Sequence, residues 1–253
     1  MKKYLLCLSF LYLNILAYSQ TPFVCTGDFY ISLSSGGSTS LNQINIDAFG
    51  NANFTNITNN ISNSINAIGY RSTDNLIYGV IPGSGALYQI DANGIAAFLS
   101  NLGLNANNSY IAGDVTPDGN FLVLLGRNGA SNELVKVELN SATYASTSIP
   151  LINSATGSTN TSVTCADIAF NPITGVLYGY NTSNDQLVTI DVTTGVINTG
   201  LFPTAAASHL GALFFDPSGN LWRYGVQTGG PSSGQDDLFS IDISTGATTY
   251  ITS

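Results

Sequence analysis

The sequence predicts an all-β protein, a β-propeller of about five four-stranded blades, with an incomplete or open propeller from a longer parent as the alternative. One observation is an internal repeat of about fifty residues, a length typical of propeller blades or solenoid arrays. Each repeat also alternates apolar and polar residues at strand spacing, and none sustains an apolar pattern at 3.6 residues. The repeat is marked by an aliphatic residue before an acid, in Ile46-Asp47, Ile90-Asp91, Val137-Glu138, Ile190-Asp191 and Ile241-Asp242.

The fourth repeat shows the strands and turns of one blade most clearly. Strands are expected at 165–170, 176–180 and 186–191, with a fourth beginning at Val196. Between the first two, Pro172 fixes an early turn position and Gly175 accepts the positive φ that closes the turn.

The second, third and fifth repeats follow the same order of strands and turns. The first repeat has clear second and third strands at 28–33 and 41–47, but only the short segment 22–25 before them. Aromatic residues recur at one position of the second strand, and we expect them to pack the blades rather than to form a carbohydrate platform. They are Tyr30, Tyr78, Tyr178 and Trp222.

Residues 1–19 are expected to be a secretory signal peptide. The basic start Met1-Lys2-Lys3 precedes an apolar run, 4–16, that is short for a membrane span. Ala17 and Ser19 then place small residues where a signal peptidase tests them. We therefore expect cleavage after Ser19, one propeller domain over 20–253, and a secreted protein that is extracellular or on the cell surface.

The charge balance disfavours whole classes of partner. The chain has 6 Lys and Arg against 15 Asp and Glu, a formal net charge of -9. Nucleic acids and anionic membrane surfaces are bound by clustered Lys and Arg, which are few and scattered here. We therefore expect no nucleic-acid partner, no membrane insertion after signal cleavage, and a monomer.

Residues suited to catalysis or metal binding are scarce. The repeated acids stand beside Gly turns, where an acid usually accepts hydrogen bonds from turn backbone. The better positions for a Ca²⁺ ion, 114–118 and 236–237, lack a complete calcium-loop motif. His209 is the only histidine, and no Gly-x-Ser-x-Gly elbow accompanies it. We therefore expect no catalytic, cofactor-binding or metal-binding residues.

Cys25 and Cys165 are the two cysteines that remain after signal cleavage. In an exported protein they could form a single disulfide. They begin strands in the first and fourth repeats, which are not neighbours in a five-membered ring. A disulfide and two free buried thiols therefore both stay open.

The pattern Leu177-Tyr178-Gly179, Leu187, Ile190-Asp191 and Thr194-Gly195 resembles secreted bacterial β-propellers of the quinoprotein-like and YVTN-repeat kind. The resemblance covers nearly the whole mature chain. The segments 23–30 and 67–71 are also similar to uncharacterised propeller-like domains of bacterial surface and adhesin-like proteins. This resemblance implies extracellular display and interaction rather than a reaction.

We therefore expect a non-catalytic module that binds a protein or glycan through loops on one face. The expected connectors are 34–40, 126–132, 152–162 and 227–235, all rich in Gly, Ser and Asn. One alternative is a lactonase-like or hydrolase-like enzyme with a channel metal, for which the inner strands offer only Asp114 and Asp167. Another is a structural spacer of a surface protein.

Overall fold

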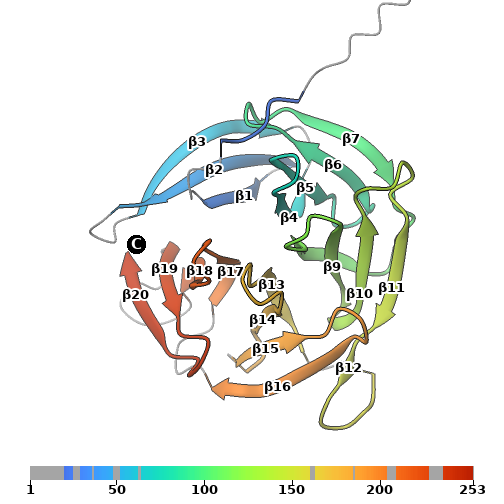
Figure 1. Ribbon diagram of the computed structural model, residues 1–253, viewed down its shortest axis with the longest axis vertical. Helices are drawn as coiled ribbons and strands as arrows, with labels where there is room; N and C mark the ends of the chain where they lie inside the picture. The colour runs from blue at the N-terminus through green and yellow to red at the C-terminus, as the bar shows by residue number, and fades with distance from the viewer. Residues whose placement is uncertain are drawn as a thin grey trace, which may run out of the picture.

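A computed structural model describes residues 20–24, 29–35, 37–47, 52–61, 64–159, 163–184, 186–203, 209–227 and 236–252. Over this part of the chain it holds twenty strands in five sheets, and none of the described segments is a helix that could cross a membrane. The sheets stand around an open centre as the blades of a β-propeller (Figure 1). The predicted five-bladed, all-β fold is confirmed.

Each blade is built from strands consecutive in the sequence, as the repeat predicts. The strands of the five blades are β1 (Phe29–Ser35), β2 (Ser38–Ile46) and β3 (Ala52–Ile61); β4 (Asn66–Arg71), β5 (Leu76–Val80), β6 (Ala86–Ile90) and β7 (Ala96–Asn101); β8 (Ser109–Val115), β9 (Phe121–Asn128), β10 (Ala130–Glu138) and β11 (Ser146–Pro150); β13 (Cys165–Phe170), β14 (Leu177–Asn181), β15 (Gln186–Ile190) and β16 (Val196–Pro203), with the short β12 (Ile152–Asn153) outside β16; and β17 (His209–Phe215), β18 (Leu221–Gln227), β19 (Asp236–Ile241) and β20 (Thr248–Thr252).

The core lies between neighbouring blades, because each strand turns alternate side chains to opposite sheet faces. Val123 of the third blade and Ile168 and Leu177 of the fourth belong to one buried cluster. The ring closes in the same way, with the rings of Phe29 in the first blade and Phe214 in the fifth centred 4.5 Å apart. Among the described strands, none is shared between these two blades.

The first blade has three described strands, and β1 is the innermost of them. Its register shows which strand of a full blade it represents. Tyr30 of β1 pairs with Gln43, just as Tyr78 of the second strand β5 pairs with Gln89. β1 is therefore the second strand of its blade, as the first repeat predicts.

The turn chemistry of the repeat is also confirmed. Gly175 and Gly219 have φ values of 72° and 82°, a region that glycine enters without steric cost. Asp191 Oδ1 accepts backbone N–H groups two and three residues later at 2.7 and 3.1 Å. Asp91 and Asp242 accept comparable bonds at 2.8 Å. These three acids stabilise turns, as their position beside Gly predicts.

Candidate functional site

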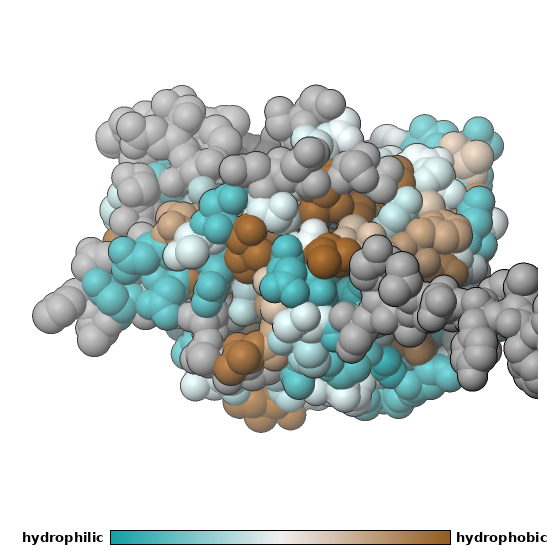
Figure 2. Space-filling model, turned by 90° about the horizontal axis from the view of Figure 1, so that it is seen from above, coloured by the Kyte–Doolittle hydropathy of each residue, from teal (hydrophilic) through white to brown (hydrophobic). Residues whose placement is uncertain are grey.

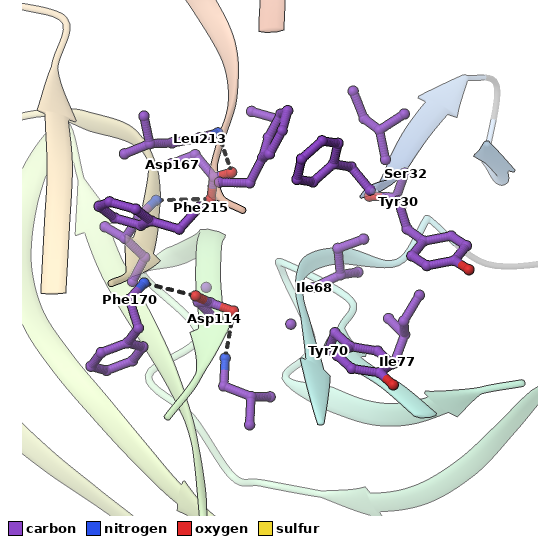
Figure 3. Close-up of a pocket in the computed structure, with 18 of the residues that line it drawn as sticks. Tyr30, Ser32, Ile68, Tyr70, Ile77, Asp114, Asp167, Phe170, Leu213 and Phe215 are labelled. Atoms are coloured by element: carbon purple, nitrogen blue, oxygen red, sulfur yellow. Dashed lines mark hydrogen bonds between the residues drawn. The ribbon is translucent and has the colours of Figure 1, made fainter. Parts of the chain in front are cut away.

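A cavity of about 830 Å³ occupies the centre of the ring and is lined by β1, β4, β8, β13 and β17. Ligand pockets span about 300 to 1,000 Å³, so this volume is ample for a ligand. Figure 3 shows Asp114, Asp167 and Phe170 on one side and Tyr30 and Ile68 on the other. Most of the lining side chains are apolar or aromatic.

Asp114 and Asp167 are the acidic side chains that the inner strands contribute to this wall. Asp114 Oδ2 accepts the backbone N–H of Phe170, in the next blade, at 2.8 Å. Asp167 Oδ2 accepts the backbone N–H of Leu213, again one blade on, at 2.9 Å. The second oxygen of each carboxyl accepts the N–H of its own following residue, at 2.8 and 2.9 Å. The two acids therefore join the third, fourth and fifth blades at the inner ring.

Burial changes the protonation of both groups. Desolvation raises the pKa of Asp114 to about 7, against the stabilising N–H groups of Phe170 and Val115. Desolvation also raises the pKa of Asp167 to about 8, and the charge of Asp114 adds to this rise. A large fraction of each carboxyl is thus protonated near neutral pH. A carboxylate oxygen has two lone pairs, so each could still contact a ligand.

The structure separates the acids that the sequence grouped as a possible Ca²⁺ site. Asp114 lies in the cavity wall, whereas Asp118 accepts the Thr116 hydroxyl at 2.5 Å and the Asn120 N–H at 3.0 Å within the turn. Of the second position, 236–237, only Asp237 has a described side chain, and it is buried. In the described part of the chain, no three His, Cys, Asp or Glu residues gather as metal ligands would.

The structure describes the two predicted cysteines and the histidine only in part. Cys165 is buried on β13, but Cys25 lies outside the described residues, so the disulfide stays a prediction. His209 is the first residue of β17, and its side chain also lies outside the described part.

The recurring aromatic residues pack blades together, as expected. The ring of Tyr178 is centred 5.4 Å from that of Phe215 in the next blade. The ring of Trp222 lies 6.3 Å from that of Phe29 across the closure of the propeller. Both aromatic side chains therefore contact the neighbouring blade of the propeller.

Two of the predicted binding connectors are strands instead. The described residues of 34–40 include the end of β1 and the start of β2, and Ser35 pairs with Ser38. Residues 126–132 form the β9–β10 hairpin, in which Asn128 pairs with Ala130. Their Gly and Ser content suits tight hairpin turns and misled the prediction of open loops. Of 227–235, only Gln227 is described.

Sequence reasoning missed a buried arginine that links two blades. The Arg71 Nε donates to the carbonyl of Gly119 at 2.7 Å, and Nη1 to Asp74 at 2.7 Å. Nη2 also donates to the side chain of Asn140. The only signal in the sequence was the rarity of basic residues, which does not reveal these partners.

Comparison with known proteins supports the architecture. A family model described as "Repeat of unknown function (DUF6923)" matches residues 29–231. No curated protein is significantly similar in sequence.

Several solved structures share the fold. A catalytically inactive virginiamycin B lyase from Staphylococcus aureus, solved with quinupristin, is 15% identical with a TM-score of 0.52, and the match covers 93% of this chain and 73% of that one. A gluconolactonase from Xanthomonas campestris is 13% identical with a TM-score of 0.52, covering 84% and 71%. A chain of a nidogen/laminin complex is 11% identical with a TM-score of 0.51, covering 81% and 68%. Enzymes and a binding protein thus share this fold, which alone does not decide between them.

Proposed function

Because the chain belongs to the DUF6923 repeat family and folds around a mostly apolar cavity, we propose that it is a non-catalytic binding module. Its ligand enters the central cavity rather than resting on loops of one face. The cavity itself carries this proposal. Its lining is mostly apolar, and both inner-strand carboxyls are already bonded to backbone N–H groups.

The lining favours a protein segment over a glycan. Polar side chains such as Arg127 also line the cavity, but most of the wall is apolar or aromatic, as at Ile68 and Phe170, and this favours an apolar ligand. On the side that Figure 2 presents, hydrophobic residues form separate patches among polar ones. The cavity is therefore the better-developed apolar surface for such a ligand.

The setting of this binding is proposed to be outside the cell. The basic and apolar start of the chain supports export with cleavage after Ser19. The formal net charge of -9 would favour solubility there. We further propose that the module acts as a monomer.

The cavity proposal is tested with Nile red, an uncharged apolar dye whose fluorescence rises on binding. Ala166 lines the cavity, so Ala166→Phe should fill part of it and weaken dye binding at least about ten-fold. Ala155 is exposed in a turn outside the cavity, so Ala155→Phe is the matched control and should bind like the wild type. Equal binding by both variants would contradict a cavity site.

A second candidate is an enzyme that uses Asp114 and Asp167 for proton transfer. Raised pKa values in a cleft favour it, because such groups cluster at catalytic sites. A panel of lactone, ester and glycoside substrates decides the question. Turnover that disappears in both Asp114→Asn and Asp167→Asn would replace the binding proposal.

A further inference from the structure

The two ends of the central cavity differ in chemistry. At one end lie the turns that follow the inner strands β4, β8, β13 and β17. One exposed residue from each of these turns lines the cavity, and we call these four residues the rim: Ser72, Pro117, Pro172 and Pro217. Because the rim residues are both exposed and part of the lining, the cavity opens to solvent at this end.

The rim continues the apolar wall of the cavity outward. Three of its four residues are prolines, whose rings present apolar surface. Val24 also lines the cavity and is 77% exposed. The backbone N–H of its neighbour Phe23 donates to the carbonyl of Asn75 at 2.8 Å, in the turn that holds Ser72. An apolar segment that enters here therefore meets apolar surface before it reaches the interior.

The other end of the cavity carries a positive charge. The inner strands begin there, and Asn66, the first residue of β4, is part of the lining. Arg127 of β9 pairs with Ser109, the first residue of β8, and lines the same end. Burial raises the pKa of the Cys165 thiol to about 12, and the charge of Arg127 acts against this rise. The guanidinium of Arg127 therefore lies near the start of β13.

Arg127 is the only basic residue among the described residues that line the cavity. The lining acids Asp114 and Asp167 accept backbone N–H groups of the next blade, and Asp216 accepts the N–H of Asn220 at 2.8 Å in its own turn. A guanidinium can bind a carboxylate through two parallel N–H donors. A cation in a mostly apolar wall is stabilised by such a partner, so it favours a ligand that carries a carboxylate.

We propose that the cavity binds the C-terminal end of another polypeptide, with the α-carboxylate at Arg127 and the last apolar side chains along the wall toward the rim. This rests on the proposed function, because it names the ligand of the same cavity. The six residues of β4 would extend about 20 Å, so a chain end of about six residues spans the cavity. A chain end suits this geometry better than an internal segment, because it passes the rim only once and carries its carboxylate at the tip.

The experiment uses the whole chain, immobilised at pH 6. At this pH the raised pKa values of Asp114, about 7, and Asp167, about 8, keep most of both carboxyls neutral, while a peptide carboxylate is charged. The probe is a mixture of acetylated hexapeptides whose last four residues are drawn from Ala, Val, Leu and Phe. It is made once with a free C-terminal carboxylate and once as the C-terminal amide. Mass spectrometry of the retained peptides should show the free acids at least about ten-fold above the amides.

A third mixture separates a chain end from an acidic side chain. Its peptides end in an amidated Asp, so they carry a carboxylate without a free chain end. We expect them to be retained at least about three-fold less than the free acids. Equal retention would overturn the chain-end ligand and assign the carboxylate to an acidic side chain.

Variants at Arg127 test the position of the carboxylate. Arg127→Gln should abolish the preference for free acids, whereas Arg127→Lys keeps the charge without the paired donors and should retain part of it. Lys136→Gln is the matched control, because Lys136 lies on the neighbouring strand β10, 4.4 Å from the ring centre of Phe121, and outside the cavity lining. It should keep the wild-type preference, and thermal melting checks that each variant is folded.

Two further variants test entry through the rim. Pro172→Glu places a charge on the rim, whereas Thr174→Glu places it in the same exposed turn but outside the lining. A charge covered by an apolar segment is unfavourable, so only Pro172→Glu should reduce the retention of free acids, at least about three-fold. Equal retention by the two variants would overturn this path of entry.

The possible outcomes separate this inference from the cavity proposal. Nile red binding without a preference for free acids, or with a preference that Arg127→Gln keeps, would overturn the chain-end ligand and leave the cavity proposal standing. Binding of neither dye nor peptides would overturn both.

Discussion

The stability of the propeller should fall as the pH rises from 5 to 8, because two inner-strand carboxyls must ionise in the cavity wall. Desolvation raises the pKa of Asp114 from 3.8 to about 7 and that of Asp167 from 3.8 to about 8. The folded state therefore holds more protons than the unfolded state between pH 4 and these values. Under that condition, the free energy of unfolding decreases with increasing pH.

The size of the effect follows from the pKa shift. One pKa unit corresponds to about 1.4 kcal/mol. Asp114 stays protonated in the folded state until the pH nears its pKa of about 7, so the two pH units from 5 to 7 change the free energy of unfolding by at most about 2.7 kcal/mol. Relaxation around the new charge returns part of this penalty. We expect the free energy of unfolding to fall by about 2 kcal/mol per carboxyl over this range.

The assay is urea unfolding at pH 5, 6, 7 and 8 for the wild type, Asp114→Asn, Asp167→Asn and the double variant. Each Asn has one accepting oxygen instead of two, so it also loses a backbone bond worth about 1 kcal/mol at every pH. The comparison is therefore of slopes, and the double variant should be nearly flat. Asp118→Asn is the control, because its turn carboxyl has a lowered pKa and should leave the slope unchanged. A double variant with the wild-type slope would refute this account of the cavity wall.

Three further predictions concern the buried arginine, the turns and the N-terminus. Arg71→Ala should lower the free energy of unfolding by about 3 kcal/mol, because it leaves the buried partners of the guanidinium unsatisfied; urea unfolding measures this, and a change below about 1 kcal/mol would contradict a structural role. Gly219→Val should destabilise the fold more than Gly175→Val, because both glycines have positive φ but only a Cβ at Gly219 would meet Ile173, at 3.0 Å. We expect at least about 1 kcal/mol for either variant, and unchanged melting of both would count against the turn assignment. The exported protein should have the mass of a chain that starts at Gln20, and a retained Met1 would disprove signal cleavage.

The blade architecture could be predicted from the sequence because it depends on local sequence patterns. Alternation, Pro and Gly in the turns, and acids beside those turns act within about ten residues of one another. The repeated Asp191 and Asp242 could be assigned to turns for that reason. The second-strand identity of β1 followed from the position of Tyr30 in the same pattern.

The inner wall could not be predicted because its interactions cross between repeats. Asp114 bonds to Phe170, 56 residues later, and Asp167 to Leu213, 46 residues later. No local rule selects those partners, and the two acids do not stand at equivalent positions of their strands. Their presence on inner strands was visible, but their role in joining blades was not.

The small residues of the inner strands show how closely the blades meet around the cavity. Gly69 and Gly113 let β4 and β8 approach so closely that their backbones touch. The centre of a propeller therefore narrows wherever two inner strands are neighbours. On the side of the first blade, β1 stands at the second-strand position. Apolar side chains on this side, including Ile68, line the central space. The ring closes through apolar packing between the first and fifth blades, in which Phe29 lies against both Phe214 and Trp222 and Phe54 lies against Tyr224, so these two blades hold together with no described strand shared between them.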